Sequence, residues 1–157
     1  MNALSFFAQG HPKGQPRPKA FARKFGDTYS ARVYDPGTAE NWKSQIADAF
    51  RRAYPTFDAF TGTVELRIIF YMPRPKSHFR SNGEIKPKAP EFCETKPDLD
   101  NLEKAVMDCL TQLMVWRDDS QVCLKITTKT YTAAPLTAWS IPGAQIEVRT
   151  IEKEAGK

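Results

Sequence analysis

Apolar and polar residues alternate along several stretches of the chain, which is the pattern of β-strands that bury one face. The clearest stretch runs from Thr63 to Tyr71, where an apolar residue stands at every second position. Further strands are predicted at Leu4–Ala8, Tyr29–Tyr34, Gln121–Thr128 and Ala144–Ile151. The pattern therefore predicts a sheet with one face against a core.

A helix is predicted to begin at Thr38 or Glu40 and to end before Pro55. In this stretch apolar residues recur at the three- and four-residue spacing of an amphipathic helix. Proline is unfavourable inside a helix, so Pro55 marks its end. The pattern places Trp42 and Ile46 in the core and assigns to the exposed side Lys43, Arg51 and Arg52.

A second helix is predicted after Asp100, which is a favourable N-cap residue. Its apolar residues Leu102, Val106, Cys109 and Leu113 follow the helical spacing. Strands on both sides of two helices indicate an α+β (mixed α/β) fold. We therefore expect a single domain over residues 1–157, with a mixed sheet and two main helices.

Two long proline-bearing segments interrupt the regular patterns, at Gly10–Lys24 and Pro73–Pro90. Prolines and basic residues together indicate exposed loops, and basic loops suit contacts with phosphates. The basic residues that we assign to such contacts are Lys13, Arg17, Lys19, Arg23, Arg74, Lys76 and Arg80. A solvated linker is the alternative for the first segment. For the second, a mobile loop in which Phe79 packs locally is the alternative to one in which Phe79 contacts a base.

The composition supports a polyanionic partner without proving one. The 157 residues carry a formal charge of +5 and a pI near 9.2. Three cysteines without a C-x-x-C pair favour a reducing compartment, and Cys109 and Cys123 are predicted to be buried. No signal peptide or membrane-spanning apolar run is evident, so we expect a cytoplasmic protein without a membrane partner.

Candidate chemistry gathers between Lys96 and Gln121. Asp98 and Asp100 lie two residues apart, and Lys104 follows Asp100 by one helical turn. A second acidic pair, Asp118 and Asp119, closes the stretch. Carboxylates are the ligands that Mg²⁺ prefers, with Mn²⁺ as a substitute. The second pair can join the first only if the chain returns to the start of the helix.

An Asp-x-Asp motif also occurs in several unrelated kinds of protein. A surface helix capped by aspartate is common and stays an alternative. An EF-hand loop does not fit, because Leu102 and Glu103 stand where a ligand and the turn glycine are needed. A nucleotide-sugar transferase needs a nucleotide-binding unit that the pattern does not show. The two histidines, His11 and His78, lie in basic loops and give no triad for nucleophilic hydrolysis.

The segments KPDLDNLEKAVMDCL and WRDDSQV resemble the signature of the RusA family of Holliday junction resolvases. Similarity to this family extends to Gly10–Lys19, Tyr34–Ile46 and Phe70–Arg80. One departure is visible: many relatives have a glycine soon after the helix, where this chain has Gln112 and Leu113.

The resemblance implies a Mg²⁺-dependent homodimeric endonuclease that resolves four-way DNA junctions by paired symmetric nicks in recombination and repair. It implies metal-binding positions at Asp98, Asp100 and Asp119, a functional lysine at Lys104, and Asp118 as the neighbouring acid. Two alternatives stay open: a non-catalytic protein that binds branched DNA, and a metal nuclease acting on other nucleic acid structures.

Overall fold

The structure is a computed structural model that describes residues 2–17, 19–34, 37–133 and 140–151, with only the backbone for several residues between 19 and 34. These residues form, in chain order, β1 (Ala3–Gln9), β2 (Lys19–Phe25), β3 (Thr28–Tyr34), α1 (Glu40–Ala53), β4 (Val64–Met72), the 3₁₀ turn η1 (Lys76–His78), α2 (Leu99–Gln112), the 3₁₀ turn η2 (Asp119–Gln121), β5 (Val122–Tyr131) and β6 (Gly143–Thr150).

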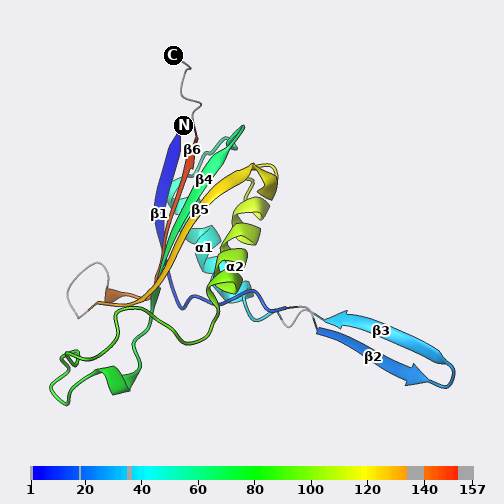
Figure 1. Cartoon of the computed structure of the whole chain (residues 1–157). Helices are drawn as coiled ribbons and strands as arrows, with labels where there is room; N and C mark the ends of the chain where they lie inside the picture. The colour runs from blue at the N-terminus through cyan, green and yellow to red at the C-terminus, as the bar shows by residue number, and fades with distance from the viewer. Residues whose placement is uncertain (1, 18, 35–36, 134–139, 152–157) are drawn as a thin grey trace.

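Four strands form a mixed sheet in the order β1-β6-β4-β5. β4 pairs with β5 in parallel, and the other neighbours are antiparallel. Alternate residues of β1 and β6 are buried, as are most residues of β4, and α1 and α2 lie along the sheet (Figure 1). The predicted α+β architecture, with a mixed sheet and two main helices, is confirmed.

α2 is the crossover of a β-α-β unit, because it follows β4 and precedes the parallel strand β5. The helix therefore runs back along the sheet, against the direction of both strands. Its amino end lies near the end of β4, and its carboxyl end lies near the start of β5. This topology fixes where each part of the acidic stretch can lie.

The core is built from the side chains that the helical spacing predicted. Trp42 and Ile46 of α1 and Leu102 of α2 are fully buried. Lys43 is buried as well, contrary to the prediction that it lies on the exposed side of α1. Its aliphatic stem packs inward while its Nζ reaches Glu40 Oε1 at 3.3 Å.

The burial of the cysteines differs in part from the sequence prediction. Cys109 is buried, and its thiol donates to the Lys43 carbonyl oxygen at 3.3 Å. Burial raises the pKa of this thiol to about 11. Cys123 is exposed, so its predicted burial is wrong. It is the second residue of the edge strand β5, whose residues are exposed or half-buried except for Tyr131 at its end.

The expected loop at Gly10–Lys24 is wrong from Lys19 onward. Lys19–Phe25 forms β2, which pairs with β3 through a tight turn at Gly26 and Asp27. Gly26 has φ +59°, a backbone conformation that glycine adopts without strain. The resulting hairpin projects away from the sheet and both helices (Figure 1).

The segment Pro73–Pro90 is irregular apart from η1, as expected. Phe79 is half-buried and forms an isolated backbone bridge with Ile85. Arg74 ties the segment to the end of β5, donating to the Thr132 carbonyl oxygen at 2.7 Å and the Pro90 carbonyl oxygen at 2.8 Å. No helix among the described residues is long and apolar enough to cross a membrane.

Candidate functional site

The first acidic pair lies at the amino end of α2. Asp98 is the N-cap residue in extended backbone, and Asp100 lies in the first helical turn. The predicted N-cap at Asp100 is therefore two residues too late. The Asp98 side chain makes no capping hydrogen bond, and both carboxylates are exposed. Their oxygens remain accessible to a ligand.

Contacts from β5 and from the amino-terminal segment hold this end of the helix. Lys129 Nζ donates to the carbonyl oxygens of Thr95 and Pro97, at 2.7 and 2.8 Å. The backbone N–H of Gln15 donates to the Asn101 carbonyl oxygen at 2.8 Å. The chain is thus fixed just before Asp98 and just after Asp100, although the two carboxylates are not.

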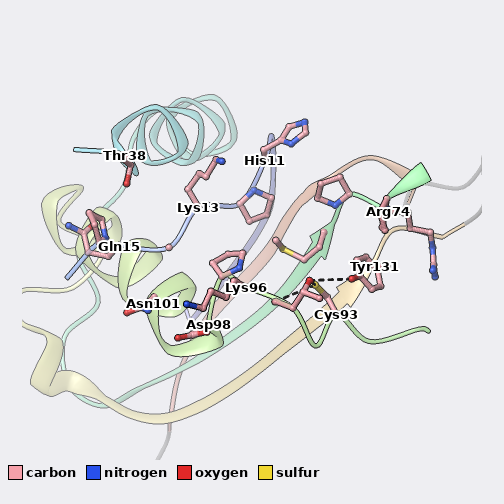
Figure 2. A pocket seen from close by; sticks show the side chains of 18 of the residues that line it. His11, Lys13, Gln15, Thr38, Arg74, Cys93, Lys96, Asp98, Asn101 and Tyr131 are labelled. Atoms are coloured by element: carbon pink, nitrogen blue, oxygen red, sulfur yellow. Dashed lines mark hydrogen bonds between the residues drawn. The ribbon is translucent and has the colours of Figure 1, made fainter. Parts of the chain in front are cut away.

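A cleft of about 1090 Å³ opens beside Asp98 (Figure 2). The amino-terminal segment forms one wall, and the segments after β4 and before α2 form the other. Its basic lining residues are His11, Lys13, Arg17, Arg74, His78 and Lys96. Asp98 is the one acidic residue among the described lining residues. A cleft of this charge suits a phosphate backbone.

Cys93 and Tyr131 lie deep in the same cleft, linked through the Thr95 hydroxyl at 3.5 and 3.4 Å. Burial alone would raise the pKa of the Cys93 thiol. Hydrogen bonds from Thr95 and Tyr131, together with the charge of Lys129, lower that pKa below its ordinary value. These contacts therefore favour the thiolate form of Cys93.

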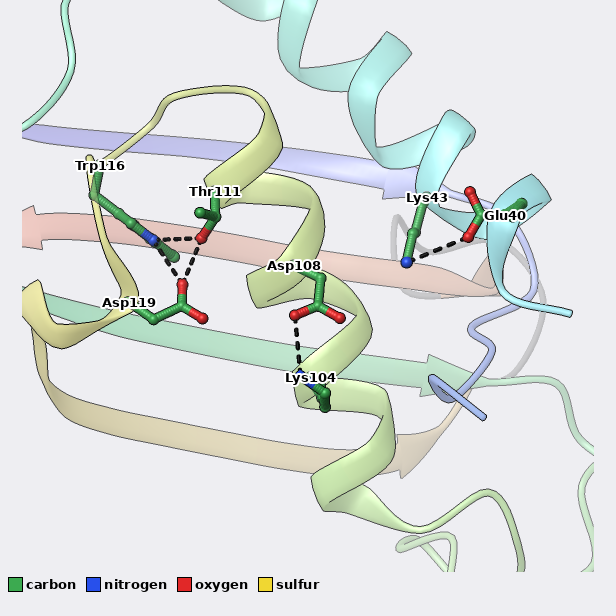
Figure 3. A network of polar contacts seen from close by, with 7 residues as sticks. All are labelled: Glu40, Lys43, Lys104, Asp108, Thr111, Trp116 and Asp119. Carbon is green, nitrogen blue, oxygen red and sulfur yellow. Dashed lines mark hydrogen bonds and ion pairs between the residues drawn. The ribbon is translucent and has the colours of Figure 1, made fainter. Parts of the chain in front are cut away.

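At the carboxyl end of α2, Asp119 is held by two neutral donors (Figure 3). Trp116 Nε1 donates to Asp119 Oδ1 at 3.0 Å and to Thr111 Oγ1 at 2.7 Å. Because the indole can only donate, Thr111 Oγ1 accepts from it and gives its own proton to Asp119 Oδ1. Trp116 is completely buried, so its ring is a rigid support. One oxygen of Asp119 is held, and Oδ2 is left for a ligand.

Asp118 and Gln121 form a capping box over the short turn η2. Asp118 Oδ1 accepts from the Ser120 N–H at 2.8 Å, and hydrogen bonds from Ser120 lower the pKa of Asp118. Gln121 Nε2 donates to the carbonyl oxygens of Phe60 and Gly62, at 3.0 and 2.9 Å. The turn η2, which carries Asp119, is therefore attached through Gln121 to the segment that precedes β4.

α2 itself ends in a Schellman motif. The Val115 N–H donates to the Leu110 carbonyl oxygen and the Met114 N–H to the Thr111 carbonyl oxygen, both at 3.0 Å. Met114 occupies the left-handed position with φ +56°, where glycine is usual. Gln112 is the last helical residue and Leu113 has φ −79°, so neither needs the backbone freedom of glycine, whereas Met114 holds the left-handed position.

Lys104 lies between the two acidic ends, and the helical spacing puts it on the same face of α2 as Asp100 and Thr111. Figure 3 shows Lys104, Asp108 and Thr111 following one another along the helix. Lys104 Nζ pairs with Asp108 Oδ1 at 3.2 Å. Polar side chains therefore follow this face of the helix from end to end. Neither Thr111 nor Trp116 was singled out as a site residue from the sequence, although a buried indole N–H needs a partner.

The two acidic pairs do not meet within one chain. Asp119 contacts Thr111, which follows Asp100 by roughly three helical turns, or ~16 Å along the axis. Within the described ranges, no three His, Cys, Asp or Glu side chains form a group that could hold a metal ion. The return of the second pair to the start of the helix, which the sequence left conditional, does not occur in this chain because β5 begins at the other end of α2.

Each pair by itself has the ligand chemistry of a magnesium site. Mg²⁺ is usually bound by one or two carboxylates, with water and substrate phosphate oxygens completing its coordination. Asp98 and Asp100 are exposed beside a basic cleft, and Asp119 keeps one oxygen without a described hydrogen bond. The residues present therefore fit a hard divalent cation shared with a phosphate.

The residues assigned to DNA contacts are spread around the cleft and its rims. Lys13 and Arg17 are exposed on the cleft wall, and Arg17 Nη2 lies 3.9 Å from Asp100 Oδ2. Arg74 is engaged by backbone carbonyl groups, as described above. Lys76 and Arg80 are exposed on the long segment, and Arg80 pairs with Glu84 at 3.5 Å. Lys19 begins β2, but its side chain lies outside what the structure describes.

Exposed carboxylates beside a basic cleft are typical of proteins that act on a phosphate backbone. Comparisons with known proteins identify the family. Residues 9–141 match the family described as endodeoxyribonuclease RusA. The chain is also 33% identical to the uncharacterized protein YqaN of Bacillus subtilis (strain 168) over 138 residues, covering 86% of this chain and 92% of YqaN. The chain therefore belongs to the RusA endodeoxyribonuclease family, and the predicted resemblance is confirmed.

Proposed function

We propose that this chain is a Mg²⁺-dependent endonuclease that resolves four-way DNA junctions by paired symmetric nicks. The observation that carries the proposal is the polar face of α2, which bears an acidic pair at each end and opens at its amino end into a basic cleft. Family membership supports nuclease activity on junction DNA.

Asp98, Asp100 and Asp119, with Asp118 beside them, are the proposed metal ligands. A bound Mg²⁺ would supply Lewis-acid stabilisation of the phosphate and lower the pKa of a water molecule. The chain's own groups do the rest. Lys13 and Arg17 hold the DNA backbone, and Lys104 neutralises charge that develops on the phosphate.

The separation of the two pairs supports a homodimer. If a second copy lies with its α2 antiparallel across a two-fold axis, the amino end of each helix faces the carboxyl end of the other. Lys104 and Asp108 lie near the midpoint of the face, so the same rotation brings Lys104 of each chain towards Asp108 of the other. Each site would then take Asp98 and Asp100 from one chain and Asp119 from the other.

A strand-specific cleavage assay tests the proposed function. The substrates are a four-way junction with a homologous mobile core, a junction with a fixed core and a linear duplex of the same sequence. Each strand is labelled in turn, in Mg²⁺, and the Asp100→Asn variant is the control. We expect paired nicks at symmetric positions in opposing strands of the mobile junction, absent in the variant.

Two results would contradict the proposal in different ways. Tight junction binding without cleavage in Mg²⁺ or Mn²⁺ would indicate a non-catalytic junction-binding protein. Equal cleavage of the linear duplex would keep the metal chemistry and reject the four-way junction as the substrate.

A further inference from the structure

Among the described residues, the β2–β3 hairpin forms a two-stranded sheet of its own. Its strands pair with each other and lie away from the four-stranded sheet (Figure 1). A two-stranded hairpin is at best marginally stable alone in water, so a projecting one gains from a partner. With seven residues in each strand, the hairpin reaches about 24 Å from its base.

The charge of this hairpin indicates the chemistry of that partner. Residues 19–34 contain four basic residues and one acidic residue, a net charge of +3 out of +5 for the whole chain. Arg23 and Lys24 are both exposed. Because neighbouring residues of a strand point to opposite faces, the hairpin presents a positive charge on each face. A polyanion is attracted to both faces, whereas a second copy of this basic chain is not.

The segment that leads into the hairpin is held beside the amino end of α2. Gln15 is hydrogen-bonded to Asn101, and a side chain at Gly14 would come within 3.0 Å of the Asn101 Cβ. Arg17 then lies 3.9 Å from Asp100. Basic residues therefore continue from the cleft, through Lys13 and Arg17, onto the hairpin.

We infer that the β2–β3 hairpin is a DNA-binding arm that contacts the phosphates of a duplex segment of the substrate, outward from the site of cleavage. The inference rests on the proposed function and specifies which surface grips the duplex arms. A two-stranded ribbon has the width of the DNA major groove and can lie in it or along its edge. The arm increases affinity for any duplex, because phosphates carry no sequence information.

The test is the salt dependence of DNA binding by the full chain. The variant is the double substitution Arg23→Gln/Lys24→Gln. The matched control is Arg51→Gln/Arg52→Gln, which removes the same charge from exposed residues of α1. Binding to a labelled four-way junction and to a linear duplex is measured by fluorescence anisotropy in EDTA, from 50 to 200 mM KCl, where no cleavage occurs.

The logarithm of the affinity falls linearly with the logarithm of the salt concentration. Each lost phosphate contact makes this slope shallower by about 0.9. For the arm variant we expect a slope that is shallower by about 1 to 2 on both DNAs. We also expect it to bind several-fold more weakly than the wild type at low salt. The control should keep the wild-type slope. Asp27→Asn, which removes the acidic residue of the arm, should strengthen binding.

An arm variant with the slope of the wild type and the control would overturn the inference. A fall in molar mass in light scattering, without a change in the slope, would also overturn it, because the arm would then hold a second copy of the chain. These readouts are independent of catalysis. A wild-type protein that binds junctions in this manner but does not cut them would reject the proposed function and leave the DNA-binding arm in place.

Discussion

The two ends of α2 present carboxylates in different ways. At the amino end, Asp98 and Asp100 are exposed, and Asp100 has an exposed arginine, Arg17, 3.9 Å away. At the carboxyl end, Asp119 is anchored by Thr111 and by the buried ring of Trp116. The backbone is fixed at both ends of α2. A carboxylate is held by neutral hydrogen-bond donors only at the carboxyl end, where the side chain is that of Asp119.

The two ends therefore differ in how ready their carboxylates are to bind a metal ion. A carboxylate held by supporting hydrogen bonds is in place before the metal arrives, whereas an exposed pair must lose side-chain freedom on binding. If both ends bind the same ion, Asp119 would provide an oxygen already in place, and Asp98 and Asp100 would adjust to the ion and the phosphate. This division of roles requires that both ends of α2 serve one reaction.

The largest effect is expected at the amino end. Asp100→Asn removes one negative charge with little change in shape, so the helix should remain intact. We expect cleavage of a four-way junction to fall at least about 100-fold, because metal-assisted charge stabilisation supplies several kcal/mol. Junction binding in EDTA should be retained. Weaker binding in proportion to the lost cleavage would show that Asp100 acts in DNA binding instead.

Mixed dimers examine whether the two ends of different chains cooperate. Asp100→Asn and Asp119→Asn chains, each inactive alone, are mixed after differential tagging, and the heterodimer is isolated. If each site combines the amino end of one chain with the carboxyl end of the other, one site of the heterodimer is intact and one is doubly altered. We expect single nicks in place of paired ones. An inactive heterodimer would show that both ends act within the same chain.

An intermediate effect is expected from the support of Asp119. Thr111→Val keeps the shape of the side chain but removes the hydroxyl that donates to Asp119. Loss of such a supporting hydrogen bond commonly weakens metal binding about 10–100-fold. Mn²⁺ affinity, measured by electron paramagnetic resonance without DNA, should fall by this amount.

The conservative variant separates positioning from folding. Thr111→Ser keeps the hydroxyl and should restore Mn²⁺ affinity close to that of the wild type. If Thr111→Val instead lowers the melting temperature while leaving Mn²⁺ affinity unchanged, the hydrogen bonds at this end stabilise the turn and do not prepare Asp119.

The sequence predicts much of this fold because its signals are local. Alternation locates β1, β4 and β6, and helical spacing with Pro55 locates α1. The hairpin strand β2 was missed because basic residues and prolines dominate the start of its segment. Its pairing with β3 depends on a turn at Gly26 and Asp27 that alternation alone does not reveal.

The candidate site was only partly predictable for a related reason. The motif locates Asp98, Asp100 and Asp119 in the sequence, but their separation follows from the parallel pairing of β4 and β5. A parallel connection requires the helix to run back along the strands, which places Asp119 at its far end. Spacing in the chain carries no information on that pairing. The support from Trp116 depends in turn on complete burial of the ring.

The smallest effect is expected where α2 ends, beside Thr111. Met114 holds a left-handed conformation that costs a non-glycine residue roughly 1 kcal/mol, and 56% of its surface is exposed. Met114→Gly should therefore remove strain while losing little packing. Part of the gain is offset because glycine has more conformational freedom in the unfolded chain. We expect a net stabilisation of about 0.5 kcal/mol by chemical denaturation. Met114→Ala is the control that loses the same packing and keeps the strain. A stabilisation shared by both variants would show that the exposed methionine side chain, and not the backbone, is unfavourable at the end of the helix.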